Sequence, residues 1–467
     1  MADTEQSGAE RAAALRVIAR LHEADHEAYL AGGCVRDLLL GRTPSDYDVA
    51  TSATPETVLA LFPRCFAVGA HFGVVLVADD SGETTTEVAT FRNDGAYSDG
   101  RHPDAVRYTL SAEEDVRRRD FTINGLLLDP LRGGGLLEEG SANPTKLRTA
   151  VLDYVGGLDD LDAGVVRAIG NPATRFEEDH LRMLRAVRFA ARFDFVLDAA
   201  TKTAIQNLAP RIAVVSRERV RDELTKMLVE GHARRAFELL DETHLLAEVL
   251  PEIARMKGVE QPPQYHPEGD VWQHVLLLLE QLPAGASKTL AWAALLHDVG
   301  KPATFHRAPD RIRFDGHAEI GATIAAAVCE RFRFSNDETD QVVALVANHM
   351  RFMDVQRMKE STLKRFFRLE KFEEHLALHR MDCLAASGHL DNWDYAKARW
   401  QTLPVDAVCP KPLVSGHELI AAGYRPGPRF RTMLETAEDA QLEGTVTTGD
   451  EALRLIHARF GPPRQES

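Results

Sequence analysis

The spacing of apolar residues changes along the chain, and this change restricts the possible folds more than any other feature of the sequence. Up to about residue 150, short β-rich runs alternate with helical stretches; these runs are Tyr47–Ala50, Phe72–Ala78 and Thr85–Phe91. From about Asp179 onward, apolar residues recur with helical spacing almost to the end. The sequence therefore predicts an α+β chain, with a small mixed sheet and helices in front and mostly helices behind.

The predicted helices lie mainly in the second part of the chain. They are Ala12–Ala24, Leu181–Phe193, Arg217–Leu228, Ala233–Leu240, Val271–Leu282, Leu290–Leu296, Ala318–Arg331, Asp337–Ala347 and Leu363–Arg368. A chain of 467 residues is too long for one hydrophobic core, so about two to four domains are expected. We predict a head at 25–150, a helical neck at 151–258, a histidine-rich domain at 259–390 and a helical tail at 391–467. The two best linker candidates after residue 150 are Gly258–Pro267 and Cys409–Pro412.

Composition excludes several classes of protein. With 44% hydrophobic and 27% charged residues, the chain is neither mainly disordered nor collagen-like. Its apolar runs, such as Leu290–Leu296, are too short to cross a bilayer, and the polar Met1–Glu10 does not resemble a signal peptide. Five scattered cysteines without a CxxC pair suggest a reducing compartment, and we expect the cytoplasm. The net charge of −16 argues against coating nucleic acid through the whole surface, but it leaves room for a local basic groove.

Two aspartates, Asp46 and Asp48, follow a glycine pair, Gly32 and Gly33, in the segment LAGGCVRDLLLGRTPSDYDV. Glycines let the backbone approach a phosphate closely. Residues i and i+2 of a strand share a face, and two such carboxylates repel each other unless a divalent cation lies between them. Mg²⁺ suits this site, and two ions about 4 Å apart could serve an in-line phosphoryl displacement. Glu87 could supply a third carboxylate. In isolation, a DxD pair more often caps a helix or faces solvent.

With the preceding Gly-Gly…Arg-Asp, this segment resembles nucleotidyltransferases of the DNA polymerase β type, and more narrowly the class II CCA-adding enzymes and bacterial poly(A) polymerases. The blocks Arg117–Gly125 (RRRDFTING) and Glu178–Arg182 (EDHLR) match the same family in order. The resemblance implies that Asp46, Asp48 and Glu87 are catalytic, with Mg²⁺ on the first two. It assigns nucleotide binding to Gly32, Gly33, Arg36, Arg118, Arg119, Asp120, Asn124, Asp179, Arg182, Arg185 and Arg188.

The neck contains three local patterns that bear on these nucleotide-binding residues. Asp179 and Arg182 are three residues apart, so we expect them to share a helix face and, by the resemblance, to read the base of CTP or ATP. Arg182, Arg185, Arg188 and Arg192 form one helical stripe, here called the arginine stripe, which in most proteins would be a solvated face. A further family block begins a helix that we expect Ser216 to cap.

The histidine-rich block supplies ligands suited to a mono- or binuclear metal site. They are His274, His297, Asp298, His317, His349 and Asp382. The string LLHDVGKP, with an upstream His and a downstream Asp, resembles the HD phosphohydrolase superfamily. The resemblance implies that these six residues bind a divalent metal of unknown identity, that Lys301 contacts a substrate phosphate, and that a 2′-nucleotidase, 2′,3′-cyclic phosphodiesterase or phosphatase activity accompanies the head. The alternative is a degenerate HD fold kept as scaffold. His266 and His306 match no motif and are expected at the surface.

The family resemblance extends to the tail, where Pro412–Ile420 and Gly423–Pro428 are similar to a segment that contacts the tRNA elbow. The chain is therefore expected to add CCA, or part of it, to tRNA 3′ ends from CTP and ATP with Mg²⁺, without a membrane and in an oligomeric state that the sequence leaves open. The loop Asp94–Pro103 resembles the mobile lever of CCA-adding enzymes, and Leu131–Pro144 is predicted to be another loop. Alternatives are a poly(A) polymerase, disfavoured because Phe66–Val74 lacks a basic string, a CC-adding or A-adding enzyme, or mainly an HD phosphohydrolase.

Overall fold

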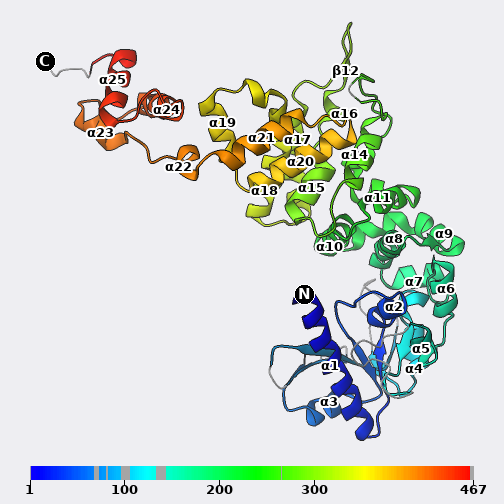
Figure 1. Cartoon of the computed structure of the whole chain (residues 1–467). Helices are drawn as coiled ribbons and strands as arrows, with labels where there is room; N and C mark the ends of the chain where they lie inside the picture. The colour runs from blue at the N-terminus through cyan, green and yellow to red at the C-terminus, as the bar shows by residue number, and fades with distance from the viewer. Residues whose placement is uncertain are drawn as a thin grey trace. The chain divides into compact units, whose positions relative to one another are not determined.

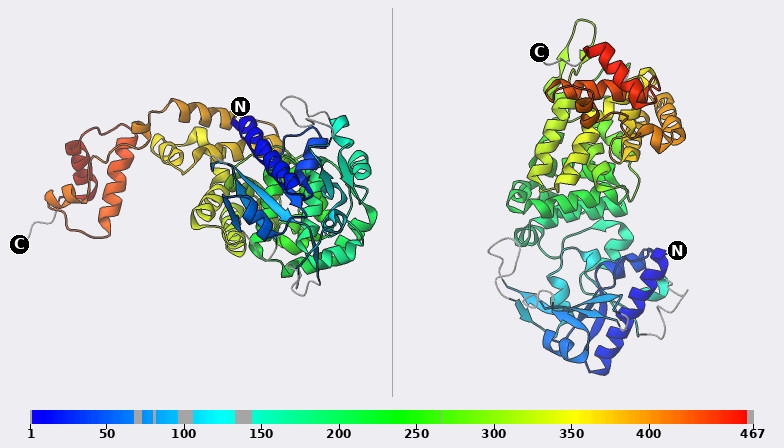
Figure 2. Two further views of the ribbon diagram at one scale, coloured as in Figure 1. Left: turned by 90° about the horizontal axis from the view of Figure 1, so that it is seen from below. Right: turned by 90° about the vertical axis from the view of Figure 1, so that its left-hand side faces the viewer.

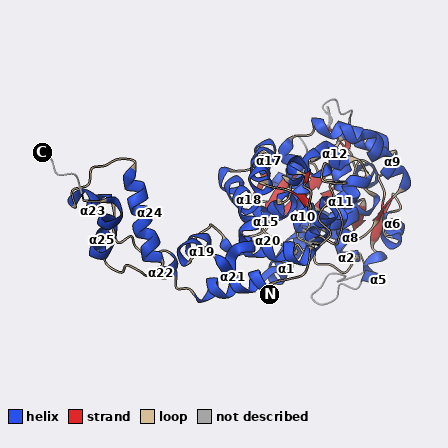
Figure 3. Ribbon diagram, turned by 90° about the horizontal axis from the view of Figure 1, so that it is seen from above, coloured by secondary structure: helices blue, strands red, loops and turns tan. Residues whose placement is uncertain are grey.

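The computed structural model describes residues 2–67, 73–79, 82–95, 106–132, 144–264 and 266–462. The chain forms two compact units, Met1–Pro251 and Glu252–Ser467. Helices make up most of the chain, and the larger sheet belongs to the first unit (Figure 3). The predicted fold class, a head with a mixed sheet followed by mostly helical parts, is confirmed. Among the described residues, no helix is both long and apolar enough to cross a membrane.

The sheet of the head has seven strands. In spatial order they are β3 (Cys65–Ala67), β4 (Val74–Ala78), β5 (Thr85–Thr90), β2 (Val49–Thr51), β1 (Ala28–Ala31), β8 (Leu126–Leu128) and β9 (Val151–Asp153). β2 and β5 are parallel, and every other neighbouring pair is antiparallel. The smaller pairs are β6 (Arg92–Asp94) with β7 (Val106–Tyr108), β10 (Val165–Val166) with β11 (Val196–Leu197), and β12 (His306–Arg307) with β13 (Ile312–Arg313).

The first unit also contains the helices of the head and neck. They are α1 (Ala2–Glu23), α2 (Gly33–Leu39), α3 (Pro55–Leu61), α4 (Ala112–Arg117), η2 (Thr122–Asn124), α5 (Pro144–Arg148), α6 (Gly157–Ala163), α7 (Pro172–Glu178), α8 (Leu181–Phe193), α9 (Ala199–Leu208), η3 (Ala209–Val214), α10 (Arg217–Val229), α11 (Ala233–Glu242) and α12 (Leu245–Val249). α1 packs on the sheet against β1, β2 and β5 (Figure 2). In the neck, α8 packs against α10 and α11 through its apolar side.

The second unit is almost entirely helical (Figure 1). Its helices are α14 (Val271–Glu280), α15 (Lys288–Leu296), α16 (Lys301–Thr304), α17 (His317–Arg331), α18 (Asn336–Asn348), η4 (His349–Arg357), α19 (Glu360–Phe367), α20 (Phe372–Ala385), α21 (Asp391–Thr402), α22 (Val405–Val408), α23 (Gly416–Ala421), α24 (Arg429–Leu442) and α25 (Gly449–Phe460); α13 (Pro251–Ala254) lies at the boundary of the units. α15 is buried from Thr289 to Leu296 and packs against α14, α18 and α20. It is therefore the central helix of this unit.

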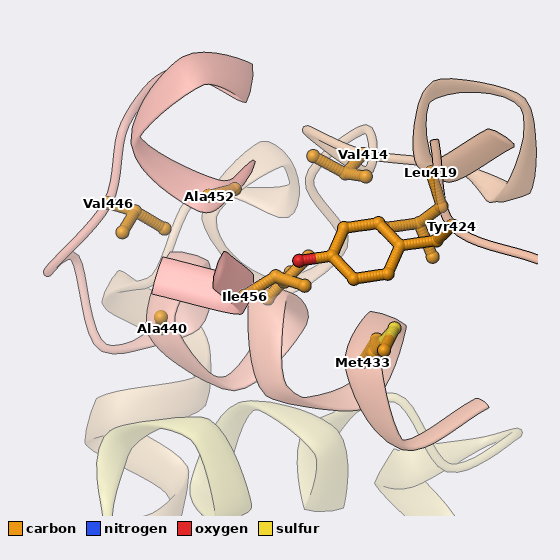
Figure 4. Packing of buried hydrophobic residues seen from close by; sticks show 9 residues of the cluster. Val414, Leu419, Tyr424, Met433, Ala440, Val446, Ala452 and Ile456 are labelled. Carbon is orange, nitrogen blue, oxygen red and sulfur yellow. The ribbon is translucent and has the colours of Figure 1, made fainter. Parts of the chain in front are cut away.

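The two predicted linkers differ in structure. Gly258–Pro267 is not a free linker, because Gln261 is buried at 4% exposure and accepts a hydrogen bond from Lys301. Beyond Cys409–Pro412, the tail has its own core, which includes Val414, Tyr424, Met433 and Ile456 (Figure 4). The boundaries of the four predicted domains stay predictions.

Some sequence predictions concern residues outside the described part of the chain. Most of the lever loop Asp94–Pro103 and of the loop Leu131–Pro144 falls there, as do residues 68–72 of the run Phe66–Val74. The described residues next to the lever form the antiparallel pair β6–β7. The strand predicted at Tyr47–Ala50 begins two residues later, at Val49, so Asp46 and Asp48 immediately precede β2.

Candidate active sites of the head and the second unit

The three predicted catalytic carboxylates belong to two adjacent strands or their flanks. Val49 of β2 pairs with Val88 of β5 in parallel register, so Asp48 and Glu87, each one residue earlier, are neighbours across the ladder. Burial, followed by the charges of Asp46 and Glu87, raises the pKa of Asp48 to about 7. Burial and the charge of Asp46 also raise the pKa of Glu87. This repulsion is what a divalent cation would relieve, and a set of carboxylate oxygens fits Mg²⁺.

Asp46 and Asp48 line a cleft of about 420 Å³. Of the residues predicted to bind nucleotide or metal, the cleft is lined by Gly32, Gly33, Arg36, Asp46, Asp48, Arg119, Asp120, Asn124, Arg185 and Arg188. A second cavity of about 270 Å³ shares Asp48 and Arg119 with the first and is also lined by Glu87, Arg92 and Arg118. The structure thus gathers most of the predicted head residues around Asp48.

Gly32 lies at the turn between β1 and α2, and its backbone requires glycine. Its φ is 74°, and a Cβ there would come within 3.1 Å of Nη1 of Arg119. Any side chain would therefore strain the turn, and the guanidinium of Arg119 would have to shift by a few tenths of an ångström.

A carboxylate that the sequence analysis did not identify holds two of the predicted phosphate ligands. Asp115 is 1% exposed. Its Oδ1 accepts a hydrogen bond from Nη2 of Arg118 at 2.7 Å, and its Oδ2 accepts one from Nη2 of Arg119 at 3.0 Å. Burial alone would raise the pKa of Asp115, but the two guanidinium charges outweigh it and lower the pKa. The signal was present in the sequence, since Asp115, on α4, lies three and four residues before Arg118 and Arg119.

Asp120 and Asn124 form a continuous polar network with two arginines. Asn124 donates to Oδ1 of Asp120 at 3.1 Å and accepts from Nη1 of Arg36 at 2.5 Å. Arg185 of α8 lies 2.9 Å from Oδ2 of Asp120. Burial raises the pKa of Asp120, but the Arg185 charge and the Asn124 hydrogen bond outweigh it and lower the pKa. The carboxylate therefore stays ionised inside the cleft and holds α8 of the neck against the head.

The expectation that Asp179 and Arg182 share a helix face is wrong. Asp179 has extended backbone angles (φ −148°, ψ 105°) and lies between α7 and α8, whereas Arg182 lies within α8. Asp179 accepts two hydrogen bonds from Arg219 of α10, at 2.7 and 3.2 Å, and Arg182 pairs with Glu178. The spacing of three residues does not place the two side chains on one helix face, because Asp179 precedes α8. Its carboxylate accepts a hydrogen bond from the backbone N–H of Leu181, the first residue of α8.

The arginine stripe is paired with acidic side chains rather than solvated. Arg188 lies 2.7 Å from Glu223 and is 6% exposed, and Arg192 lies 3.6 Å from Glu230. Lys226 of α10 also lines the cleft and was not predicted. The sequence could have indicated Lys226, because the spacings of four, three and four place four charged residues on one helix face: Arg219, Glu223, Lys226 and Glu230. Among the described residues, Ser216 makes no capping hydrogen bond through its side chain, although it holds the N-cap position of α10.

The six predicted ligands of the second unit converge from five helices or their ends. Nε2 of His274 lies 3.3 Å from Nε2 of His297 and 3.1 Å from Oδ1 of Asp382. Nε2 of His317 lies 3.3 Å from Nε2 of His349. We call these residues and Asp298 the HD centre: His274, His297, Asp298, His317, His349 and Asp382.

Asp298 stands between two groups of ligands. Its Oδ2 is 3.2 Å from Nε2 of His297, and its Oδ1 is 3.6 and 3.8 Å from Nε2 of His317 and His349. Two triads of ligand atoms result, each compact enough for one ion: His274, His297 and Asp382 on one side, and Asp298, His317 and His349 on the other. The buried Lys301 lies 2.7 Å from Oδ2 of Asp298. Its predicted contact with a substrate phosphate stays a prediction.

The hydrogen bonds of the histidines test whether this centre suits a metal. Nδ1 of His297, His317 and His349 each lies 2.7–2.9 Å from a main-chain carbonyl, which can only accept a proton. The proton is therefore on Nδ1, and the Nε2 lone pairs of the three rings face the centre. Converging nitrogen lone pairs and carboxylates fit a divalent cation.

Burial lowers the pKa of His274, but its hydrogen bonds to Asp382 and Glu268 outweigh burial and raise the pKa to about 9. The two remaining histidines of the block lie in different surroundings. His306 is exposed, as expected. His266 contradicts the expectation of a surface residue, because its side chain is 19% exposed, hydrogen-bonds Glu268 and packs edge-on against His274 at 5.1 Å.

The head combines a glycine turn and paired carboxylates at a mixed sheet, and it is followed by a helical neck and a centre of histidines and aspartates. These features together define a nucleotidyltransferase with an HD domain. Family models agree: a poly(A) polymerase head domain matches residues 28–167, a probable RNA- and SrmB-binding site of polymerase A matches 194–257, and an HD domain matches 270–405.

Known CCA-adding enzymes are similar over most of the chain. The enzyme of Leuconostoc mesenteroides is 31% identical over 446 residues, 95% of each chain. That of Geobacillus thermodenitrificans is 38% identical over 332 residues, 70% of this chain and 73% of the relative. The crystal structure of the Bacillus stearothermophilus CCA-adding enzyme in complex with CTP superimposes with a TM-score of 0.70 at 27% identity, covering 96% of both chains. The chain belongs to the family of CCA-adding enzymes.

Proposed function

We propose that this enzyme completes the 3′ end of tRNA with CCA, from CTP and ATP and with Mg²⁺ at the head. The observation that carries the proposal is the placement of Asp46 and Asp48 in one cleft with the polar network of Asp120, Asn124 and Arg185. The lining of the cleft combines carboxylates that repel one another with guanidinium groups suited to a triphosphate. Free thiols at all five cysteines, which lie within the described residues, support a cytoplasmic setting.

The side chains of the head would have three different roles: metal binding, phosphate binding and ribose binding. Mg²⁺ held by Asp46 and Asp48 would supply the activation of the terminal 3′-hydroxyl and the stabilisation of the leaving pyrophosphate. Arg118 and Arg119, held by Asp115, offer planar forks to phosphate oxygens. Asp120 and Asn124 present an ordered pair of polar groups to a ribose.

Asp179 and Arg182 would recognise the base of the incoming nucleotide, and both side chains already form hydrogen bonds within the protein. Arg219 fixes the carboxylate of Asp179 through two bonds, and Glu178 fixes the guanidinium of Arg182. Binding of a base therefore requires these side chains to share or exchange their present bonds. A template made of paired side chains is rigid, and rigidity favours discrimination between two bases.

The test of this function is a set of three RNAs: tRNA without CCA, tRNA lacking only the final A, and an oligo(A). Each is given CTP, ATP or both. We expect completion to CCA on the first, addition of one A on the second and no extension of the third, with all activity lost in Asp46→Ala. ATP-dependent extension of all three would indicate a poly(A) polymerase, and arrest after CC or failure to add C would indicate a partial enzyme.

A second function is supported by the HD centre, whose two triads of ligand atoms could each hold an ion. We propose that it hydrolyses phosphate esters at RNA or nucleotide ends. The test is release of phosphate from a 2′-nucleotide with Mg²⁺, Mn²⁺, Ni²⁺ or Co²⁺. Release should vanish in Asp298→Ala and persist in Asp46→Ala. If none of the four ions supports release, the HD centre is scaffold.

A further inference from the structure

The four histidines of the HD centre are oriented in two different ways. His297, His317 and His349 each direct Nδ1 to a carbonyl three residues earlier, those of Ala294, Phe314 and Val346, at 2.7–2.9 Å. These carbonyls belong to a helix end or to the turn before a helix, where oxygens accept bonds outside the regular helical pattern.

His274 lies inside α14, where the preceding carbonyls serve the helix itself. Its Nδ1 instead lies 2.8 Å from Oε1 of Glu268, a side chain in the loop before the helix. The same oxygen lies 2.9 Å from Nδ1 of His266. Among the four acceptors of these Nδ1 groups, Glu268 is thus the one that a substitution can remove.

We propose that Glu268 is a positioning residue of the HD centre, which fixes the ring and tautomer of His274 so that its Nε2 is presented to the metal, and that His266 holds Glu268 in place. The proposal rests on the proposed metal-binding function of this centre. A carboxylate behind a histidine ligand orients the ring and makes it a better donor.

Burial and charge support this role. The side chain of Glu268 is 6% exposed, and that of His274 is fully buried. Oε2 of Glu268 is buried and has no hydrogen-bond partner in the described part of the chain. A buried carboxylate that directs its bonding to two imidazoles through one oxygen is costly to keep unless those bonds serve the centre.

The geometry also permits a rival interpretation, in which His266, Glu268 and His274 hold an additional ion of their own. This ion would take Nδ1 of His274 while Nε2 faces the HD centre. A ring bound to metal through both nitrogens has lost both protons and is an imidazolate anion. A ring that donates Nδ1–H to Glu268 and offers Nε2 to one metal needs no such ionisation, so the hydrogen-bonded relay is favoured.

The experiment measures metal binding directly, in full-length protein that carries Asp46→Ala and Asp48→Ala so that the head is silent. Co²⁺ is titrated by calorimetry and by its visible absorption. Glu268→Gln keeps the shape of the side chain and removes its charge. The matched control is Glu260→Gln, the same change in the same loop at a side chain that is 61% exposed. CCA addition by Glu268→Gln with an intact head reports on correct folding.

We expect Glu268→Gln to weaken Co²⁺ binding about 10- to 100-fold, with an altered visible spectrum. His266→Ala should act in the same direction but less, and Glu260→Gln should match the parent. CCA addition should stay unchanged. Wild-type affinity and spectrum in Glu268→Gln would overturn the relay. Loss of one whole equivalent of Co²⁺ at unchanged affinity for the rest would overturn it in favour of an additional ion. If the parent binds no Co²⁺ that Asp298→Ala removes, the proposed metal centre itself fails, and that result is distinct from both.

Discussion

Binding of Mg²⁺ to the head is expected to release a proton, because Asp48 has a pKa of about 7 in the metal-free protein. Its ordinary value is 3.8, so the shift is about three units, and at 1.36 kcal/mol per unit the cost of ionising Asp48 approaches about 4 kcal/mol. This is an upper limit, since Asp48 keeps some contact with solvent. The folded pKa lies above the unfolded one, so the metal-free head loses stability as pH rises from about 4 to about 7.

The proton count follows from the same pKa. At pH 6 about 0.9 of the Asp48 side chains are protonated, and at pH 8 about 0.1. Mg²⁺ takes the place of this proton, so binding should release close to one proton per chain at pH 6 and almost none at pH 8. Apparent affinity should rise with pH over the same interval. The number of protons released on Mg²⁺ binding is measured by calorimetry in two buffers of different ionisation enthalpy. The protein carries Asp298→Ala, so that metal binding at the HD centre does not contribute.

The Glu87→Gln variant tests whether neighbouring carboxylates raise the pKa of Asp48. Burial contributes most to the raised pKa of Asp48, followed by Asp46 and then Glu87. Removing the Glu87 charge should lower that pKa and reduce the protons released at pH 6, while weakening Mg²⁺ binding at pH 8. Release of fewer than about 0.3 protons per chain at pH 6, or the same number of protons from Glu87→Gln as from the unchanged head, would contradict a pKa near 7 for Asp48.

Four further expectations concern the rest of the molecule. Asp115→Asn should lower kcat/KM for CTP at least about tenfold, because hydrogen bonds to charged groups contribute about 1.5–3 kcal/mol; unchanged kinetics would contradict the clamp on the arginines. Arg219→Ala should free the carboxylate of Asp179 and raise misincorporation of ATP for CTP, measured by sequencing of products. Ile456→Ala should destabilise the tail by about 2–5 kcal/mol, seen as an earlier thermal transition, with addition to a minihelix preserved. The salt dependence of tRNA binding should be shallow, well below the slope for about ten phosphates, since the arginine stripe is already paired with acids.

Local patterns predicted much of the structure. The helix Leu181–Phe193 has the predicted bounds because its apolar residues keep one helical period, and it ends where Asp194 takes the left-handed conformation (φ 55°). The DxD pair of Asp46 and Asp48 and the strand that carries Glu87 could be predicted because each is a local pattern, whereas their nearness depends on the pairing of β2 with β5.

What the sequence could not predict depends on contacts between distant segments. The pairing of Asp179 with Arg219 is set by where α10 packs against α8, and this pairing decides which way the carboxylate points. His266 carries no local sign of burial, and it contacts Glu268 and His274 only because the loop before α14 folds against that helix. Glu268 was missed for the same reason.

The most direct test of the account is a competition in one tube. The enzyme receives tRNA lacking CCA together with an excess of oligo(A), with CTP and ATP, and all 3′ ends are sequenced. We expect that the tRNA ends in CCA, that oligo(A) is not extended, and that Asp46→Ala leaves both RNAs unchanged. Homopolymeric A tails on either RNA, or addition that survives Asp46→Ala, would contradict it.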